Sequence, residues 1–236
     1  MELDLDSPTQ YRILCIDPGT ETLGVSVLGY DVVTNVPGVI AGITLHAERL
    51  ARRNLVSFLH GDRFARNMAL FRALVELCEE YQIHSAVIES PWLGKFAETF
   101  AALTECCFIC KQAVYAYDPT IVLHKVDPPT AKLAVGAVTT KEDRKGPVRD
   151  AVLALGLSCS KDFDMLEFSE HVIDSIAVGY WYYRIHQGNP VITEARAKRA
   201  RKKRKPKNAA EPVTVPVPSR RRSRRRRKKS RRSSAG

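Results

Sequence analysis

Short apolar runs alternate along the chain with segments whose apolar residues recur at helical spacing. Runs rich in Val, Ile and Leu and bounded by turn-forming residues predict five strands, at 11–17, 23–29, 39–46, 84–89 and 121–126. Apolar residues spaced three and four positions apart predict long helices at 61–82, 96–114 and 169–185, and two short helices at 131–135 and 148–155. The first three strands are close enough in sequence for an antiparallel meander, and the later strands alternate with helices. This order predicts an α/β fold, a mixed five-stranded sheet with helices on both faces.

Charge divides the chain into two regions. From residue 193 to residue 236 there are 20 Lys and Arg residues but two acidic residues, so this segment carries +18. The whole chain carries +11, and residues 1–192 therefore carry −7. The basic segment has few large apolar side chains, and without them it cannot bury enough surface to fold. We expect an N-terminal extension at 1–10, a folded domain at 11–188 and a disordered Lys/Arg-rich tail at 189–236.

The remaining composition narrows the class of protein. No stretch reaches the roughly 18 apolar residues of a membrane span, and the acidic N-terminus lacks the pattern of a secretory signal. Most of the six cysteines lie within apolar runs, which is typical of buried, reduced thiols. Cys107 and Cys110 have CxxC spacing, but no second pair stands at the spacing of a zinc site, so we interpret them as part of a buried helix face. These features predict an intracellular protein in a reducing compartment, with no membrane partner.

Three acidic residues stand at strand ends or on an apolar helix. Asp17 closes the first predicted strand and Glu89 closes the fourth, so their carboxylates converge if these strands are neighbours. Asp174 lies in the last predicted helix, with His171 one turn before it on the same face. An acid in such apolar surroundings needs a partner or an ion. Glu170, four residues before Asp174, is an alternative to His171 as the fourth member of the set.

Three carboxylates and an imidazole suit one kind of chemistry. Mg²⁺ prefers carboxylate and water oxygens, and two divalent ions about 3.5–4 Å apart can activate a water and stabilise the leaving oxygen in phosphodiester hydrolysis. The sequence therefore predicts a site for two Mg²⁺ or Mn²⁺ ions at Asp17, Glu89, His171 and Asp174. The simpler interpretation is that each acid is a solvated turn residue, since Asp before Pro-Gly commonly begins a turn. The joint placement of the acids favours the metal site.

Several segments resemble the motifs of a known family, the RuvC-like Holliday junction resolvases. The opening motif of that family, a strand, an Asp, Pro-Gly-Thr and a second strand, is similar to ILCIDPGTETLGVSVL. The second motif, in which an aromatic residue follows Glu shortly, resembles AVIESPWLGKFAETF, and the closing helix resembles HVIDSIAVGYW. The Lys-bearing segment resembles VDPPTAKLAVGAV with KGPVRDAVLAL. The resemblance covers residues 11–186; the stretch after Gly136 is longer than the family pattern, and the basic tail has no counterpart in it.

The resemblance implies both an architecture and an activity. The fold would be ribonuclease H-like, and the protein would be a homodimeric enzyme of viral or phage type. It would cut four-way DNA junctions symmetrically in recombination, replication or repair. The four residues of the predicted metal site would be the metal ligands, without a nucleotide cofactor. Lys132 and one later lysine would contact the scissile region; Lys145 matches best, with Lys141 as its competitor. Trp92 would take the place of the aromatic residue that stacks on an unpaired base near the crossover.

Further DNA contacts are expected from positive charges near the predicted site and in the tail. Besides Trp92, they are Lys95, Lys141, Arg144, Arg149 and the basic residues from Arg196 to Arg232. Two basic clusters, at 196–207 and 219–232, flank a Pro- and Val-rich spacer. The tail suits a DNA-binding arm, a nuclear localisation signal in a eukaryotic host, or both.

Three other functions share some of these features. Flaps, forks and other branched DNA are alternative substrates for the same nuclease. A noncatalytic DNA-binding protein would have the same tail but no need for the set of acids. An Asp-x-Gly-Thr turn also opens actin-like and sugar-kinase domains, but these need two such domains and a second phosphate loop, for which a core of about 190 residues is short.

Overall fold

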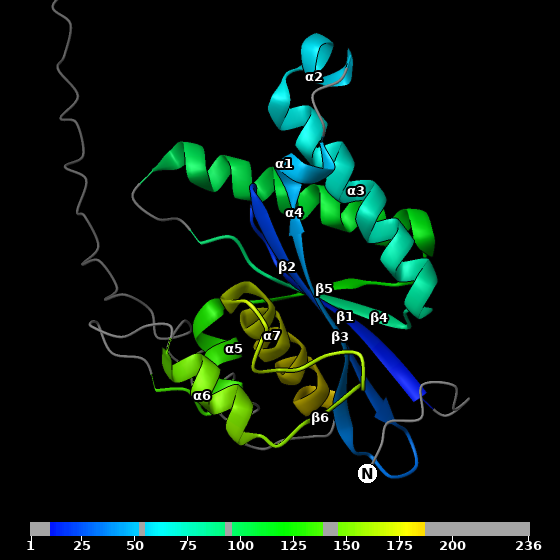
Figure 1. Cartoon of the computed structure of the whole chain (residues 1–236), viewed down its shortest axis with the longest axis vertical. Coiled ribbons are helices and arrows are strands. Elements are labelled where there is room, and N and C mark those ends of the chain that lie inside the picture. Colours follow the sequence, from blue (N-terminus) through cyan, green and yellow to red (C-terminus); the bar gives the residue numbers. More distant parts are fainter. Residues whose placement is uncertain (1–9, 52–54, 93–95, 139–145, 187–236) are drawn as a thin grey trace, which may run out of the picture. The chain divides into compact units, whose positions relative to one another are not determined.

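The computed structural model describes residues 10–51, 55–92, 96–138 and 146–186 of the 236-residue chain. Within these residues six strands form one mixed sheet in the order β5-β4-β1-β2-β3-β6 (Figure 1). They are β1 (Gln10–Asp17), β2 (Thr22–Asp31), β3 (Pro37–His46), β4 (Ser85–Glu89), β5 (Leu123–Val126) and β6 (Ser158–Cys159). β1, β2 and β3 form the predicted antiparallel meander, and β4 and β5 run parallel to β1. The five predicted strands are confirmed; β6 has two residues, too few to show a period in the sequence.

The predicted helices are also confirmed, with small shifts of their ends. They are α3 (Asp62–Tyr81), α4 (Ala97–Tyr117), α5 (Pro128–Ala134), α6 (Gly146–Ala154) and α7 (Glu170–His186). α5 begins earlier than predicted, at Pro128, because the first turn of a helix does not use the N–H that proline lacks. Two short helices, α1 (Ala47–Leu50) and α2 (Leu55–His60), were not predicted, since so few residues show no helical period. No helix in the described part of the chain is long and apolar enough to cross a membrane.

The sheet separates two apolar cores. Side chains alternate between the faces of a strand, so Leu14 and Ile16 of β1 lie in the core shared with α3 and α4, and Ile13 and Cys15 lie in the core shared with α5, α6 and α7. All four are fully buried, which explains why the segment is apolar throughout. Figure 1 shows α3 and α4 on one side of the sheet and α5, α6 and α7 on the other. We refer to these sides as the α3/α4 face and the α7 face.

α7 packs closely on the sheet because glycines lie between them. A Cβ at Gly24 in β2 would overlap the backbone carbonyl of His171, and a Cβ at Gly179 in α7 would overlap core side chains of the sheet. A buried hydrogen bond of 2.9 Å, from the hydroxyl of Ser175 to that of Ser26 in β2, joins the helix to the sheet between these two points. A larger residue at either glycine would push the helix away.

The cysteines are free thiols within the two cores. Five of the six are buried and Cys159 is half-buried. Burial raises the pKa of Cys15, Cys78 and Cys107 to about 12, so these thiols stay protonated. Cys107 and Cys110 lie in the core of the α3/α4 face, which confirms the interpretation of the CxxC pair as packing.

Candidate active site

The ends of two central strands bring the first two carboxylates to one edge of the sheet. β1 and β4 are parallel neighbours, with Ile16 opposite Ile88, so Asp17 and Glu89 follow side by side. Each closes an apolar run and precedes a turn or loop, which leaves both side chains half-buried. The expected pairing of the first and fourth strands is therefore confirmed, and with it the basis for placing these two acids together.

α7 carries the other two candidate ligands to this edge. The Nδ1 atom of His171 lies 2.9 Å from Oδ2 of Asp17. The side chain of His171 is 47% exposed and that of Asp17 is 13% exposed, so solvent reaches the pair from the histidine side. Asp174 follows one turn later in α7 and is half-buried. Gly24 pairs with Asp17 across the sheet, and its missing side chain allows the turn with His171 to come this close.

The surroundings of Glu89 disfavour its charged form. Its pKa is raised from 4.5 to about 8, mainly by burial and then by the negative charges of Asp17 and Asp174. Lys132, in the last turn of α5, opposes this rise, and Asp127 adds to it. The carboxylates of the two strand ends and of α7 are therefore close enough to repel one another.

Asp174 shows the same pattern from the side of the helix. Its pKa is raised from 3.8 to about 6, mainly by burial and then by Asp17, while Lys132 and His171 oppose the rise. Lys132 thus acts on both half-buried carboxylates, and its contact with the scissile region stays a prediction. Glu170 adds to the rise through its negative charge. Both candidates for the fourth ligand are near the carboxylates, and His171 contacts one of them directly.

The donor set suits a hard divalent cation. Three carboxylates that repel one another in half-buried surroundings are stabilised by a proton or a cation, and carboxylate oxygens are the ligands that Mg²⁺ prefers. In the part of the chain that the structure describes, no three or more His, Cys, Asp or Glu side chains stand in the closed arrangement of a metal site. The candidate ligands therefore converge on one edge without forming a closed coordination shell.

Two exposed aromatic side chains lie in the segment between β4 and α4. Trp92 is 66% exposed and stands three residues after Glu89, so it lies on a loop, as expected from the Ser-Pro before it. Phe96, at the start of α4, is 70% exposed and was not predicted as a functional residue. Lys95 lies between them, outside the described residues.

The other expected DNA contacts fall into two groups. The guanidinium of Arg149, in α6, donates two hydrogen bonds of 2.6 and 3.0 Å to the backbone carbonyl of Phe168, and its contact with DNA stays a prediction. The remaining residues lie outside the described part of the chain: Lys141, Arg144, Lys145 and the basic tail.

Two features of the site were missed in the sequence. One is Gly24, for which a signal exists, because a glycine within a strand often marks a close approach. The other is a pair of thiols beneath the site: Cys106 donates to the carbonyl of Gly19 at 3.5 Å and Cys107 to the carbonyl of Glu89 at 3.9 Å. A cysteine on an apolar helix gives no signal that distinguishes it from other core residues.

Comparison with known proteins shows what the fold is similar to. No protein-family model and no curated protein matches the chain in sequence. Among solved structures, RuvC of Thermus thermophilus has a TM-score of 0.56 at 15% identity, and RuvC of the same organism in complex with Holliday junction substrate has 0.54 at 14%; each comparison covers 75% of this chain and 96% of the other. The yeast mitochondrial Holliday junction resolvase has a TM-score of 0.54 at 16% identity, over 76% of this chain and 81% of the other. The chain therefore has the fold of these RuvC structures, and the expected ribonuclease H-like fold is confirmed.

Proposed function

We propose that this chain is a structure-specific endodeoxyribonuclease that resolves four-way DNA junctions in recombination, replication or repair. The observation that carries the proposal is the convergence of three half-buried carboxylates, from β1, β4 and α7, on one edge of the sheet. The choice of substrate draws support from the fold, which is similar to that of a RuvC in complex with Holliday junction substrate.

The residues of the candidate site would share the work as follows. Asp17, Glu89, His171 and Asp174 would hold two Mg²⁺ or Mn²⁺ ions, which when bound would activate water and stabilise the leaving oxygen. His171 would orient Asp17 through the hydrogen bond between Nδ1 and Oδ2. The ammonium of Lys132, which already acts on Glu89 and Asp174, would attract the scissile phosphate to this edge. Either Lys145 or Lys141 would add a second positive charge.

Trp92 would recognise the branch point. A half-buried tryptophan usually packs against the fold, whereas this one exposes two thirds of its surface on the loop next to Glu89. Aromatic stacking on a base is sequence-tolerant and contributes about 1–3 kcal/mol. Trp92 would therefore stack on a base that is unpaired at the crossover and help to hold the junction open.

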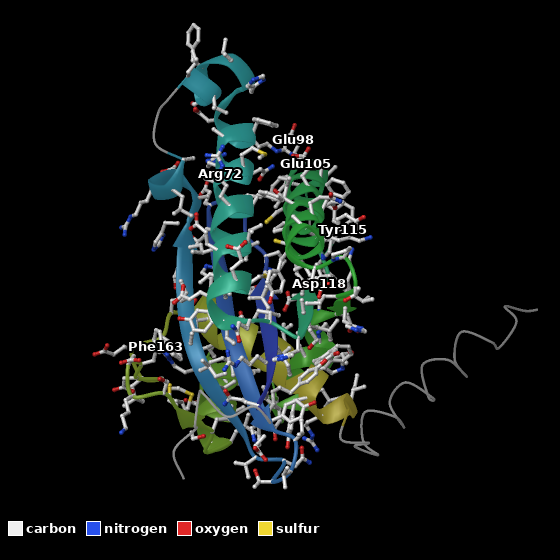
Figure 2. The ribbon with its side chains drawn as sticks, turned by 90° about the vertical axis from the view of Figure 1, so that its right-hand side faces the viewer. Arg72, Glu98, Glu105, Tyr115, Asp118 and Phe163 are labelled. Carbon is white, nitrogen blue, oxygen red and sulfur yellow. The ribbon has the colours of Figure 1, made fainter. Side chains whose placement is uncertain are left out.

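A homodimer would match the symmetry of the substrate. The two strands to be cut in a junction are related by a two-fold axis, and a symmetric dimer presents two equal sites related in the same way. Phe108 and Tyr115 stand seven residues apart on α4, hence on one face of the helix, and are 59% and 60% exposed. Figure 2 shows Tyr115 on the side of α4 that is turned away from α3. This outer surface of α4 is our candidate for the dimer interface.

The basic tail would supply affinity that does not depend on DNA structure. The folded part of the chain is acidic, while the segment from 193 to 236 carries +18. Each phosphate that the tail neutralises adds about −0.9 to the log–log slope of affinity against salt. The folded part would provide the preference for junctions and the tail the salt-sensitive attraction.

Cleavage of strand-labelled four-way junctions in Mg²⁺, Mn²⁺ and EDTA tests the function. Duplex, flap and fork substrates of the same sequence serve as controls. We expect paired nicks at symmetric positions, giving two duplexes that a ligase can seal, and no cleavage in EDTA. Faster cleavage of flaps or forks would assign the enzyme to other branched DNA. Tight, selective junction binding without cleavage in either metal would identify a noncatalytic binding protein instead.

A further inference from the structure

The segment that leads into α7 is held by contacts from two elements, β3 and α6. The ring of Phe168 lies so close to Gly42 in β3 that a Cβ there would stand 2.5 Å from it. The hydroxyl of Ser169 is 2.7 Å from that of Thr44, also in β3. The carbonyl of Phe168 accepts two hydrogen bonds from Arg149 in α6. Together these contacts fix the backbone just before the helix that carries His171 and Asp174.

Arg149 provides the charged part of this anchor. Its Nη2 atom lies 2.6 Å from the Phe168 carbonyl oxygen and 3.4 Å from that of Leu166, and its Nη1 atom lies 3.0 Å from the Phe168 oxygen. Hydrogen bonds from a charged donor are roughly twice as strong as those between neutral groups. Both terminal nitrogens are engaged by the backbone, which leaves the guanidinium poorly placed to contact a phosphate.

The anchored carbonyl stands next to the first turn of α7. Phe168 precedes His171 by three residues, and the Ile173 amide donates to the Ser169 carbonyl at 3.0 Å, so the anchor continues directly into the helix. On the sheet side, the turn with His171 rests on Gly24. A displacement of about 1 Å in a catalytic group can cost on the order of 100-fold in rate. The position of Phe168 therefore bears on the distance between the ligands of α7 and those of the strands.

We propose that Arg149 is a positioning residue, which holds the α7 half of the site against the strand ends rather than contacting DNA. The proposal rests on the proposed nuclease function for its effect on catalysis. Its structural part, that Arg149 fixes the start of α7, stands independently of that function.

Two substitutions and a matched control test this role. Arg149→Gln removes the charge and the paired donors, and Arg149→Lys keeps one donor that can reach a carbonyl. Arg12→Gln is the control, because Arg12 in β1 also donates to a backbone carbonyl, that of Tyr81 at 2.9 Å, at the end of β1 opposite to Asp17. All variants are made in the full-length chain, and the rate is measured in single turnover at saturating junction.

We expect Arg149→Gln to lower the cleavage rate about 10- to 100-fold, the range for a small displacement of catalytic groups. Junction affinity and its salt dependence should stay unchanged, and Arg149→Lys should recover part of the rate. Hydrogen exchange of the amides of residues 169–175 should become faster in Arg149→Gln. Arg12→Gln should alter neither the rate nor this exchange.

Other outcomes would overturn the proposal. Weaker junction binding in Arg149→Gln, with a salt slope smaller by about 0.9 and unchanged exchange in α7, would identify a phosphate contact. Wild-type rate and exchange in both Arg149 variants would show that the anchor is dispensable. If Arg149→Gln does not fold, the same criteria apply to Arg149→Lys. If the wild-type chain does not cut junctions, the proposed function fails, and the exchange measurement still decides whether Arg149 anchors α7.

Discussion

The two faces of the sheet are both covered by helices, but their helices contribute differently to the site. The α7 face supplies His171 and Asp174 from α7 and Lys132 from α5. The α3/α4 face contributes none of the candidate ligands; it packs Cys106 and Cys107 beneath the strand ends and turns an apolar surface of α4 outward. Asp17 and Glu89 stand on the sheet between the two.

The difference lies in how the helices are held. α7 is fixed by features that tolerate little change: glycines at its points of closest approach, a buried Ser–Ser hydrogen bond and the anchor at Phe168. α3 and α4 are held mainly by burial of aliphatic side chains and thiols, which is non-directional and tolerates volume-conserving replacement. Substitutions on the α7 face should therefore act on catalysis, and those on the α3/α4 face on stability and association.

The largest effect should come from the carboxylates at the sheet edge. Asp17→Asn or Glu89→Gln removes one ligand charge with little change of shape, so we expect cleavage to fall by about 1,000-fold or more, at or beyond the upper range for the loss of one electrostatic group. Junction binding should persist, as measured by gel shift in Ca²⁺. Glu79→Gln, an exposed acid of α3, should cut normally. Near wild-type cleavage by either site variant would remove the basis of the metal site.

Gly24→Ala should also cause a large loss of rate, up to about 100-fold, because the new methyl pushes the turn with His171 away from Asp17. Ala113→Val is the matched change on the α3/α4 face, since it also adds volume at a fully buried position, in α4. It should cost about 1–3 kcal/mol of stability but leave the rate at permissive temperature unchanged. Thermal unfolding and single-turnover cleavage are measured for both variants. An equal loss of rate in both would show that the α7 face is no more important for catalysis than the α3/α4 face.

Trp92 stands on the loop from β4, which ends at Glu89, to α4. Trp92→Ala should slow cleavage of a fully paired junction about 5- to 150-fold, the equivalent of 1–3 kcal/mol of stacking. Trp92→Phe should retain much of the rate, and mismatches at the crossover should partly rescue Trp92→Ala. Phe96→Ala, the other exposed aromatic of this loop, is the control. If Trp92→Ala cuts the paired junction as fast as wild type, Trp92 has no part in opening it.

The fold and the site were predictable from the sequence to different extents. Apolar periodicity extends over whole elements, so it revealed five strands and five helices, and the strand-end positions of Asp17 and Glu89 followed from it. Contacts between distant segments leave no such pattern: the close approach of Gly24 to α7 and the hydrogen bonds of Arg149 depend on how helices meet the sheet. Arg149 shows the consequence, since a basic residue near an expected DNA site looks the same in sequence whether it faces phosphate or a carbonyl.

The outer surface of α4 should affect association before it affects chemistry. Phe108→Glu with Tyr115→Glu places two charges on the surface proposed for the dimer, and buried aromatic anchors commonly contribute more than 1 kcal/mol each to an interface. We expect the dissociation constant, measured by sedimentation, to rise about 10-fold or more, and paired nicking to become single nicking. Val33→Glu, at a still more exposed apolar position in the turn after β2, should change neither. An unchanged dimer in the double variant would place the interface elsewhere.

The smallest effect tests the electrostatic repulsion between the carboxylates at the sheet edge. Because the pKa of Glu89 is raised from 4.5 to about 8, the folded protein holds a proton between these pH values that the unfolded chain has released. In EDTA the free energy of unfolding should therefore fall as the pH rises from 4.5 to 8.

Gln carries no charge at any pH, so Glu89→Gln should lose this dependence. It should be more stable than wild type at pH 8.5 by about 1 kcal/mol, or about 2–4 °C in Tm. Asp174→Asn should show the same sign over a lower range, since the pKa of Asp174 is about 6. Mg²⁺ should raise the Tm of the wild type more than that of Glu89→Gln, because the variant has one carboxylate fewer for the cation to neutralise. The contrary result is a free energy of unfolding that changes with pH in the same way in wild type and Glu89→Gln, from pH 5 to 8.5 in EDTA. That result would mean that ionisation of Glu89 costs no stability and that the carboxylates at the sheet edge do not repel one another.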